Sequence, residues 1–483
     1  MTLLDAGDWA GRIYTDGWTT AAGGATAVTE PATGYELGSI GLAGPEDIDR
    51  AVTRAAEAQP GWAATNFEER AAVLRRAGAL WEEHAKEVED WLIREAGSIP
   101  PKAQVETHVA AQECYEAAAL ASHTLGQILA TARPRLSLAR RRPVGVVAVI
   151  APFNYPLILS IRSVAPALAL GNAVVLKPDP RTAVSGGVTL AGIFEEAGLP
   201  PGLLHVLPGG PYVGTALVEH PGVPVISFTG SSAAGRKVGE ACGRLLKRSL
   251  LELGGNSALI VLDDADLDLA VSAGAFGSFL HQGQICMTTG RHLVHSSVAD
   301  SYVERLAATA DALPVGNPAT EQVALGPLID AGQRDKVHGL VTASVDAGAR
   351  LAAGGTYENL FYRPTVLAGG GPAYDNEVFG PVAAVTRFDS LDEAVALATD
   401  TEYGLSLGIL SGDMSKALAL ADRIPSGIVH INDQTVDDEA VAPFGGRGAS
   451  GTGARFGGPE ANLAAFTDTQ WLTLQGNVDQ YPF

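Results

Sequence analysis

Short apolar segments alternate with amphipathic segments along most of the chain. The apolar runs Val144 to Ile150, Ala173 to Lys177 and Val223 to Phe228 have the length and composition of buried strands. Between and after them, residues 160–170 and 233–246 have apolar positions at helical spacing. Strands that alternate with helices in this way predict an α/β fold with a parallel, doubly wound sheet. Further helices are expected from Pro45 and over 67–96, 185–197, 267–279 and 391–399, and further strands over 203–207, 257–262 and 382–386.

Two features of the pattern suggest how the chain is divided. The strand–helix alternation restarts after Gly254-Gly255, so we expect a domain boundary near residue 253. Residues 133–142 and 467–474 instead alternate between polar and apolar, as exposed strands do. Two such strands far apart in sequence suggest a projecting flap that pairs with another subunit, and two ordinary edge strands are the alternative.

Composition narrows the possible partners. The chain has 483 residues, of which 46% are hydrophobic, and this length predicts more than one domain. The formal net charge of −21 would repel a phosphate backbone, so nucleic acid is not an expected partner. The apolar runs are short and interrupted by Pro and Gly, so no membrane span is expected.

The cysteines and the N-terminus indicate a compartment. Cys114, Cys242 and Cys286 are an odd, sparse set that does not resemble a disulfide framework. The first residues carry acidic side chains where a signal peptide carries basic ones. We therefore expect a cytoplasmic protein in which Cys114 and Cys242, on predicted helices, are packing residues.

Cys286 is the candidate for chemistry. It lies in His281-Gln-Gly-Gln-Ile-Cys-Met-Thr-Thr-Gly-Arg291, among small and polar residues that suit an accessible thiol nucleophile. Glu252, in Leu251-Glu-Leu-Gly-Gly255, is a candidate base for it, because nucleophile and base need not be neighbours in sequence. A buried structural cysteine is the alternative interpretation for a lone thiol.

A phosphate-binding turn is expected where the strand ending at Phe228 runs into Thr229-Gly-Ser-Ser-Ala-Ala-Gly235 and a helix. Free backbone N–H groups and the helix dipole would face an anion there, although a structural turn is equally compatible. The literal G-x-G-x-x-G at Gly446 to Gly451 has no strand leading directly in and no helix following, so we do not interpret it as a dinucleotide site.

Seven motifs together resemble, in order, those of the NAD(P)-dependent aldehyde dehydrogenase superfamily. They are Pro152-Phe-Asn-Tyr-Pro156, Leu176-Lys-Pro178, Phe228-Thr-Gly-Ser231, Leu251-Glu-Leu-Gly-Gly255, Gly283-Gln-Ile-Cys286, Glu377-Val-Phe-Gly-Pro381 and Pro443-Phe-Gly-Gly446. The resemblance implies a Rossmann-type nucleotide-binding domain (1–122 and 144–253) and an α/β catalytic domain (254–450). It also implies a small β oligomerisation flap with a C-terminal tail (123–143 and 451–483), and hence a homodimer or homotetramer.

The resemblance also implies a mechanism. Cys286 would attack the aldehyde carbon to give a thiohemiacetal, and Asn154 would stabilise the oxyanion together with the backbone N–H of Cys286. Loss of hydride to the nicotinamide would leave a thioester, which water activated by Glu252 would hydrolyse. The expected cofactor-binding residues are Phe153, Lys177, Gly209, Phe228, Thr229, Gly230, Ser231, Leu253, Gly254, Glu377 and Phe379. For Phe379 a core aromatic and for Gly209 a turn glycine are the alternatives.

One departure from the family pattern concerns the choice of cofactor. Many NAD-preferring members have a glutamate three residues after the lysine, where this chain has Pro180. Without that carboxylate a 2′-phosphate would meet less repulsion. We therefore expect NAD and NADP both to be used.

The segments around Cys286 and Ile431 to Glu439 resemble the benzaldehyde and vanillin dehydrogenase subgroup, which implies an aromatic aldehyde as substrate. Tyr155, Met287 and Phe444 would give apolar surface for a flat ring, and Asp437 would lie at the tunnel mouth. A solvated acidic loop is the alternative for Asp437 and its neighbours. Other possibilities are an aliphatic or semialdehyde dehydrogenase, a CoA-acylating variant, or a non-catalytic protein of the same fold. No metal site is expected.

Overall fold

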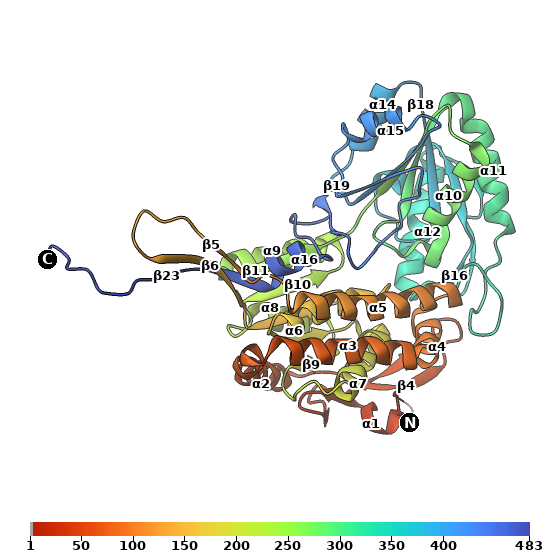
Figure 1. Cartoon of the computed structure of the whole chain (residues 1–483). Helices are drawn as coiled ribbons and strands as arrows, with labels where there is room; N and C mark the ends of the chain where they lie inside the picture. Colours follow the sequence, from red (N-terminus) through yellow and green to blue (C-terminus); the bar gives the residue numbers. More distant parts are fainter. Residues whose placement is uncertain (1–2) are drawn as a thin grey trace.

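A computed structural model describes residues 3–483. The fold is α/β, as the sequence predicts, and is built on two large sheets (Figure 1). The first sheet contains, in spatial order, β11 (Arg248–Glu252), β10 (Val225–Thr229), β7 (Val146–Ile150), β8 (Ala173–Lys177), β9 (Leu204–Val206), β1 (Arg12–Tyr14) and β2 (Trp18–Thr20). Its strands from β11 to β9 are parallel, and β1 and β2 are antiparallel.

Helices surround the first sheet, and its central strands are buried along their whole length, which is typical of a parallel sheet. Apolar side chains of the helices and strands form one continuous core. The main covering helices are α2 (Pro45–Ala64), α3 (Phe67–Glu83), α4 (Ala85–Ala96), α5 (Pro100–Leu120), α6 (Pro156–Ala169), α7 (Thr189–Glu196), α8 (Pro211–Glu219) and α9 (Ser232–Leu245).

In the sequence, the second sheet begins directly after the last strand of the first sheet. Its spatial order is β14 (Arg350–Ala353), β17 (Thr365–Ala368), β18 (Val382–Phe388), β13 (Thr289–His295), β12 (Ser257–Val261), β20 (Ser406–Leu410) and β21 (Ile428–Ile431). All its neighbouring strands are parallel except β14 and β17. It is covered by α10 (Leu267–Phe279), α11 (Ser296–Ala312), α12 (Ala331–Asp346), α14 (Leu391–Thr399) and α15 (Met414–Ala421).

Short elements complete the chain. They are α1 (Ala6–Trp9), β3 (Ala25–Thr29), β4 (Glu36–Gly41), the 3₁₀ turns η1 (Pro180–Thr182) and η3 (Leu280–Gly283), the π-helix η2 (Val184–Val188), β15 (Tyr357–Glu358), β16 (Phe361–Tyr362), α13 (Pro372–Asp375), β19 (Tyr403–Gly404), β22 (Arg447–Gly448) and α16 (Pro459–Phe466).

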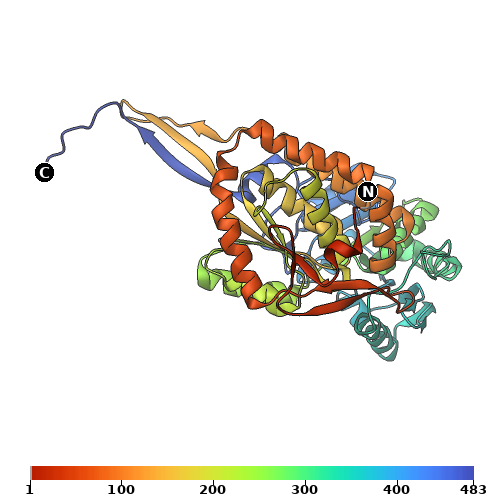
Figure 2. The same ribbon diagram turned by 90° about the horizontal axis from the view of Figure 1, so that it is seen from below.

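The two segments that were predicted as exposed alternating strands, residues 133–142 and 467–474, form parts of one small sheet. In it β23 (Thr467–Leu474) pairs antiparallel with β6 (Leu136–Pro143), and β6 pairs with β5 (Gly126–Ile128). This sheet projects from the body of the molecule, and the C-terminal tail continues beyond it (Figure 2). Trp471 and Ile128 on it are exposed. By contrast, α16 just before β23 packs Leu463 and Phe466 into the core of the first sheet.

Two predicted helices differ from the structure. The helix expected over 67–96 is two helices, α3 and α4, with a break at His84. Both pack on α5, so the apolar period continues through the break and does not reveal it. The helix expected over 185–197 begins as the π-helix η2 and continues as α7. Its backbone N–H groups at Val184 and Ser185 donate to the buried carboxylate of Glu95, far away in sequence.

No helix among residues 3–483 has the length and apolar character needed to cross a membrane.

Candidate active site

Cys286 lies where two cavities meet. The larger cavity, of about 350 Å³, and the smaller cavity, of about 150 Å³, are both lined by Cys286 and Asn154. The walls of the larger cavity are mainly apolar, whereas the smaller one is lined by the glycine-rich turns after β10 and β11. An atom bound to the thiol could therefore be reached from one side by a molecule in the larger cavity and from the other side by a molecule in the smaller cavity.

Close backbone approaches bring the two chemical motifs together. A Cβ atom on Gly255 would lie 2.3 Å from the carbonyl oxygen of Cys286, so only glycine permits this contact. The backbone before Cys286 is unusual: His281, Gln282 and Gly283 all have φ between +47° and +67°. Such a run turns the chain sharply between α10 and β13 and places Cys286 beside the end of β11.

Glu252, the last residue of β11, is almost fully buried. Among residues 3–483, no nitrogen or oxygen atom donates a hydrogen bond to either of its carboxylate oxygens. Burial raises its pKa to about 8, while the positive charge of Arg162 and the thiol of Cys286 act in the opposite direction. A carboxyl group with such a pKa can exchange a proton with water near neutral pH.

The surroundings of Cys286 favour its neutral thiol over the thiolate. Burial first, and then the neighbouring carboxylates of Glu252 and Glu377, raise the pKa of Cys286 well above its ordinary value. Its nucleophilic thiolate therefore needs a base to take the proton or a positive charge beside it.

Asn154 lies between β7 and α6, with its side chain buried beside the thiol. Its amide Nδ2 donates to the backbone carbonyl of Gln284, 2.8 Å away. The backbone carbonyl of Asn154 accepts a hydrogen bond of 2.9 Å from Lys102 Nζ. Lys102 also forms a buried ion pair with Glu106, whose carboxylate accepts from the N–H of Leu157 at 2.8 Å. The start of α6 is thus anchored by a buried charge pair from α5.

The smaller cavity gathers most of the expected cofactor residues. Those that line it are Phe153, Thr229, Gly230, Ser231, Leu253, Gly254, Glu377 and Phe379, together with Asn154, Glu252 and Cys286. Ser231 caps α9 by accepting from the N–H of Ala234, so the positive end of this helix faces the cavity. Glu377 accepts from the N–H of Gly255 at 2.9 Å, and a Cβ on Gly254 would lie 2.5 Å from its carboxylate.

Three expected cofactor residues do not line this cavity. Lys177 ends β8, Gly209 follows β9, and Phe228 lies within β10. They lie at or near the carboxyl ends of three parallel strands of the first sheet, the edge where open α/β sheets bind their ligands. Packing also explains why position 209 is a glycine, because a Cβ atom there would lie 2.3 Å from the side chain of Val213.

Four residues that line the smaller cavity were not predicted as site residues: Pro152, Leu159, Gln333 and Lys336. Gln333 and Lys336, on α12, line it opposite the glycine-rich turns. Gln333 donates to the carbonyl of Phe379 at 2.7 Å and so fixes the loop that carries this ring. No helix was predicted over these positions, and a glutamine and a lysine three apart give no signal of their own, because that spacing is common on solvated helices.

The turn after Lys177 is occupied by an ion pair. Both carboxylate oxygens of Asp179 accept from Arg181, at 2.9 and 2.8 Å, and Arg181 also bonds to Asp330 at 2.6 Å. The guanidinium of Arg181 lies over the ring of Phe153, 4.3 Å from its centre. In the sequence Pro180 therefore stands between the carboxylate and the guanidinium of this ion pair, and the guanidinium is itself paired with two carboxylates.

The larger cavity contains the expected substrate residues. Tyr155, Met287, Phe444 and Asp437 all line it. Asp437 is exposed, and its neighbour Asp438 is partly buried and forms an ion pair with Arg162. Arg162 also lines the cavity and was not predicted. It is the one charged residue in the otherwise apolar or neutral α6, and its distance of seven positions from Tyr155 could have placed it on the same helical face.

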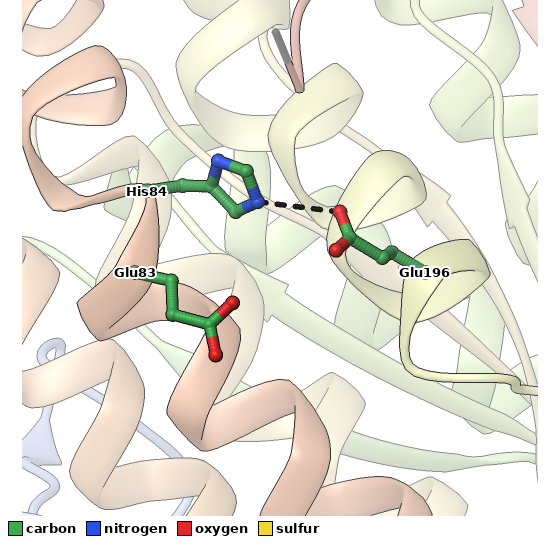
Figure 3. A group of neighbouring side chains, drawn as sticks. All are labelled: Glu83, His84 and Glu196. Carbon is green, nitrogen blue, oxygen red and sulfur yellow. Dashed lines mark hydrogen bonds and ion pairs between the residues drawn. The ribbon is translucent and has the colours of Figure 1, made fainter. Parts of the chain in front are cut away.

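One group of side chains outside the two cavities has the composition of a metal site. Glu83, His84 and Glu196 approach one another at the surface, and His84 Nε2 lies 3.2 Å from Glu196 (Figure 3). Arg76 forms ion pairs with Glu83 and Glu196, at 2.8 and 3.6 Å. This guanidinium compensates part of the charge of the two carboxylates, so the group is best described as a surface ion-pair network.

The chain is similar to proteins of one family over nearly its whole length. Residues 18–472 match the aldehyde dehydrogenase family. The chain is 71% identical to a vanillin dehydrogenase of an Amycolatopsis species, with all of both chains covered, and 50% identical to a benzaldehyde dehydrogenase [NAD(+)] of Pseudomonas putida, with 98% of each covered. A solved structure of betaine aldehyde dehydrogenase from Staphylococcus aureus with NAD+ superposes with a TM-score of 0.95 at 28% identity, covering 99% and 97% of the two chains. With Cys286, Glu252 and Asn154 gathered between two cavities, these similarities establish that the chain belongs to the aldehyde dehydrogenase family.

Proposed function

We propose that this enzyme oxidises an aromatic aldehyde of the benzaldehyde or vanillin type to its carboxylic acid, with NAD or NADP as hydride acceptor. The observation that carries the proposal is the position of the Cys286 thiol, which opens onto the larger cavity beside Tyr155, Met287 and Phe444. These side chains offer apolar surface to a flat ring. The names of the vanillin and benzaldehyde dehydrogenases to which the chain is similar support the same substrate class.

In the proposed reaction the Cys286 thiol first gives its proton to a water molecule in the cavity, and the resulting thiolate attacks the aldehyde carbon, so that the carbonyl oxygen becomes an oxyanion. Asn154 Nδ2 would then turn from the carbonyl of Gln284 to this oxyanion, with the backbone N–H of Cys286 as second donor. The lone pair of the oxyanion reforms the carbonyl, expels hydride and leaves a thioester on Cys286. Glu252 then takes a proton from water, whose oxygen attacks the thioester and releases the acid and the thiolate.

The residues of the smaller cavity fit a dinucleotide. The N-terminus of α9 behind Gly230 and Ser231 suits a phosphate, and Glu377 has a carboxylate oxygen for a ribose hydroxyl. When bound, the nicotinamide supplies the site that accepts the hydride.

We further propose that NADP is used as well as NAD. Pro180 places no carboxylate at the position that excludes a 2′-phosphate in many family members, and Asp179 is already paired with Arg181.

The substrate and cofactor proposals are tested together by initial rates. We expect kcat/KM for benzaldehyde and vanillin to exceed that for hexanal and succinate semialdehyde, with both NAD and NADP giving turnover. An aliphatic or semialdehyde substrate with the highest kcat/KM would contradict the aromatic assignment and leave the mechanism intact. A preference for NAD above about a thousandfold, roughly 4 kcal/mol, would contradict dual cofactor use.

The projecting sheet supports a proposal about assembly. We propose that the enzyme is a homodimer or homotetramer in which this sheet contacts another subunit, since Trp471 and Ile128 are 67% and 79% exposed on it. Sedimentation velocity at micromolar concentration should show a species of at least twice the chain mass, and a monomer would exclude this assembly. The three free cysteines support a reducing compartment such as the cytoplasm.

A further inference from the structure

Arg162 is a buried cation in the wall of the larger cavity. It lies on α6 with Ile158 and Leu159, at the spacing that places all three on one helical face, and this face lines the cavity together with Tyr155, the residue just before the helix. Only 3% of its surface is exposed. A guanidinium in such a position is costly unless its five N–H groups are satisfied.

The partners of Arg162 satisfy only some of its hydrogen-bond donors. Nη2 donates to Asp438, and the guanidinium lies over the ring of Phe444, 4.5 Å from its centre. Its Nε and Nη1 are buried and have no partner among residues 3–483. Oδ1 of Asp438 is likewise buried and without a partner in that range. The pair thus has unused donors and an unused acceptor, and both residues line the larger cavity.

Arg162 lies further along α6 than Ile158 and Leu159, the other residues of the helix that line the cavity. Arg162 follows Tyr155 by two helical turns, roughly 10 Å along the helix axis. Side chains on a helix lean toward its N-terminus, which brings the guanidinium back toward the reacting end of the cavity. In agreement, the charges of Cys286 and Glu252 both act on the pKa of Arg162, although burial, which lowers this pKa, has the larger effect.

The charges around the pair argue against an anionic ligand. Asp438 neutralises Arg162, and a second carboxylate, Asp437, lines the same cavity. On the α5 side, Glu113 is buried near enough for Arg162 to lower its pKa, although burial has the larger, opposite effect and raises it to about 7. Lys102, the other cation that lines the cavity, is paired with Glu106, so the fixed charge is not positive. A neutral group that both donates and accepts a hydrogen bond suits the site better than a carboxylate.

We propose that Arg162 and Asp438 are specificity residues that together recognise a hydroxyl group on the ring of the aldehyde. The hydroxyl oxygen accepts from Nε or Nη1 of Arg162, and the hydroxyl hydrogen is donated to Oδ1 of Asp438. Phe444 keeps the guanidinium plane in place for this contact. This assignment rests on the proposed oxidation of aromatic aldehydes and narrows it to hydroxylated ones.

The test compares kcat/KM for benzaldehyde, for 2-, 3- and 4-hydroxybenzaldehyde and for 4-carboxybenzaldehyde. In the wild type we expect one hydroxy isomer to exceed benzaldehyde by about 10- to 100-fold, as expected for a hydrogen bond to charged partners. Replacing the pair together, in Arg162→Met/Asp438→Leu, avoids leaving a lone buried charge. In this variant the ratio of hydroxybenzaldehyde to benzaldehyde should fall to about one.

Two single variants sharpen the test. Asp438→Asn leaves the charge of Arg162 uncompensated, so we expect the ratio of 4-carboxybenzaldehyde to benzaldehyde to rise by about tenfold. Glu439→Gln removes one acid from the exposed part of the same loop, outside the cavity lining, and should keep the wild-type ratios. Because benzaldehyde is measured in every variant, loss of folding is separated from loss of recognition.

Three results would overturn the assignment: an unchanged hydroxyl preference in the double variant, no hydroxyl preference in the wild type, or a wild-type preference for 4-carboxybenzaldehyde. Failure of the wild type to oxidise benzaldehyde and every hydroxybenzaldehyde would instead contradict the proposed function itself.

Discussion

Cys286→Ala is expected to lower kcat/KM for any aldehyde by at least about four orders of magnitude, or roughly 5.5 kcal/mol of transition-state stabilisation. The hydride can leave only from a tetrahedral carbon that carries a negatively charged oxygen, and the thiolate of Cys286 creates that carbon in the proposed reaction. No other cysteine can replace it, because Cys114 and Cys242 are buried in α5 and α9. The measurement is NADH formation under saturating cofactor.

The matched control is Cys242→Ala, which removes a thiol of the same chain that lines neither cavity. Its activity should stay within about threefold of the wild type, since it loses only a small packed group. NAD binding by Cys286→Ala, followed by calorimetry, should be retained and would show that the smaller cavity is intact. Activity in Cys286→Ala above about one hundredth of the wild type would contradict the role of this residue as nucleophile.

Glu252→Gln is expected to separate the two halves of the reaction. Formation of the thioester needs no water, so a burst of about one NADH per active site should survive. Steady-state turnover should then fall by about 10²- to 10⁴-fold, the usual contribution of a general base. Rapid mixing with absorbance at the nicotinamide band measures both phases, and loss of the burst itself would show that Glu252 instead activates the thiol.

The pH dependence provides a second readout of Glu252. Only its carboxylate form accepts a proton, and burial raises its pKa to about 8. The carboxylate therefore predominates above this pH, so kcat of the wild type should rise between about pH 7 and 9 wherever hydrolysis of the thioester limits turnover. The rise should vanish in Glu252→Gln, because glutamine does not titrate. A rise that persists in this variant would assign the pH dependence to another group.

Local patterns predicted individual elements best where no distant partner was needed. The helix α10 and the strand β23 have the bounds expected from periodicity alone, since each has a distinct run of alternating or helically spaced residues. The break between α3 and α4 and the π-helix η2 were missed. Both depend on partners far away in sequence, α5 in the first case and the carboxylate of Glu95 in the second.

The candidate site likewise contains residues that the local sequence predicted and residues that it did not. Motifs around Cys286, Glu252 and Asn154 are local, because glycines that permit close approach and residues that carry chemistry lie within a few positions of one another. Gln333, Lys336 and Arg162 were not predicted, since each lies on a helix whose own sequence gives no sign of the cavity it faces. The pairing of Asp438 with Arg162 also changes the expected role of the acidic loop, from open carboxylates at a tunnel mouth to one exposed and one neutralised acid.

The sequence by itself therefore determined the α/β class, the family and the three residues proposed for the chemistry. Strand and helix periods and reactive motifs each depend on residues that are close together in the chain. Only the tertiary structure decided which charges are paired, which pKa values are raised and what the larger cavity can recognise. Those properties arise from burial and from contacts such as Arg162 with Asp438, 276 positions apart in the chain, and neither burial nor such contacts exist until the helices and sheets have packed.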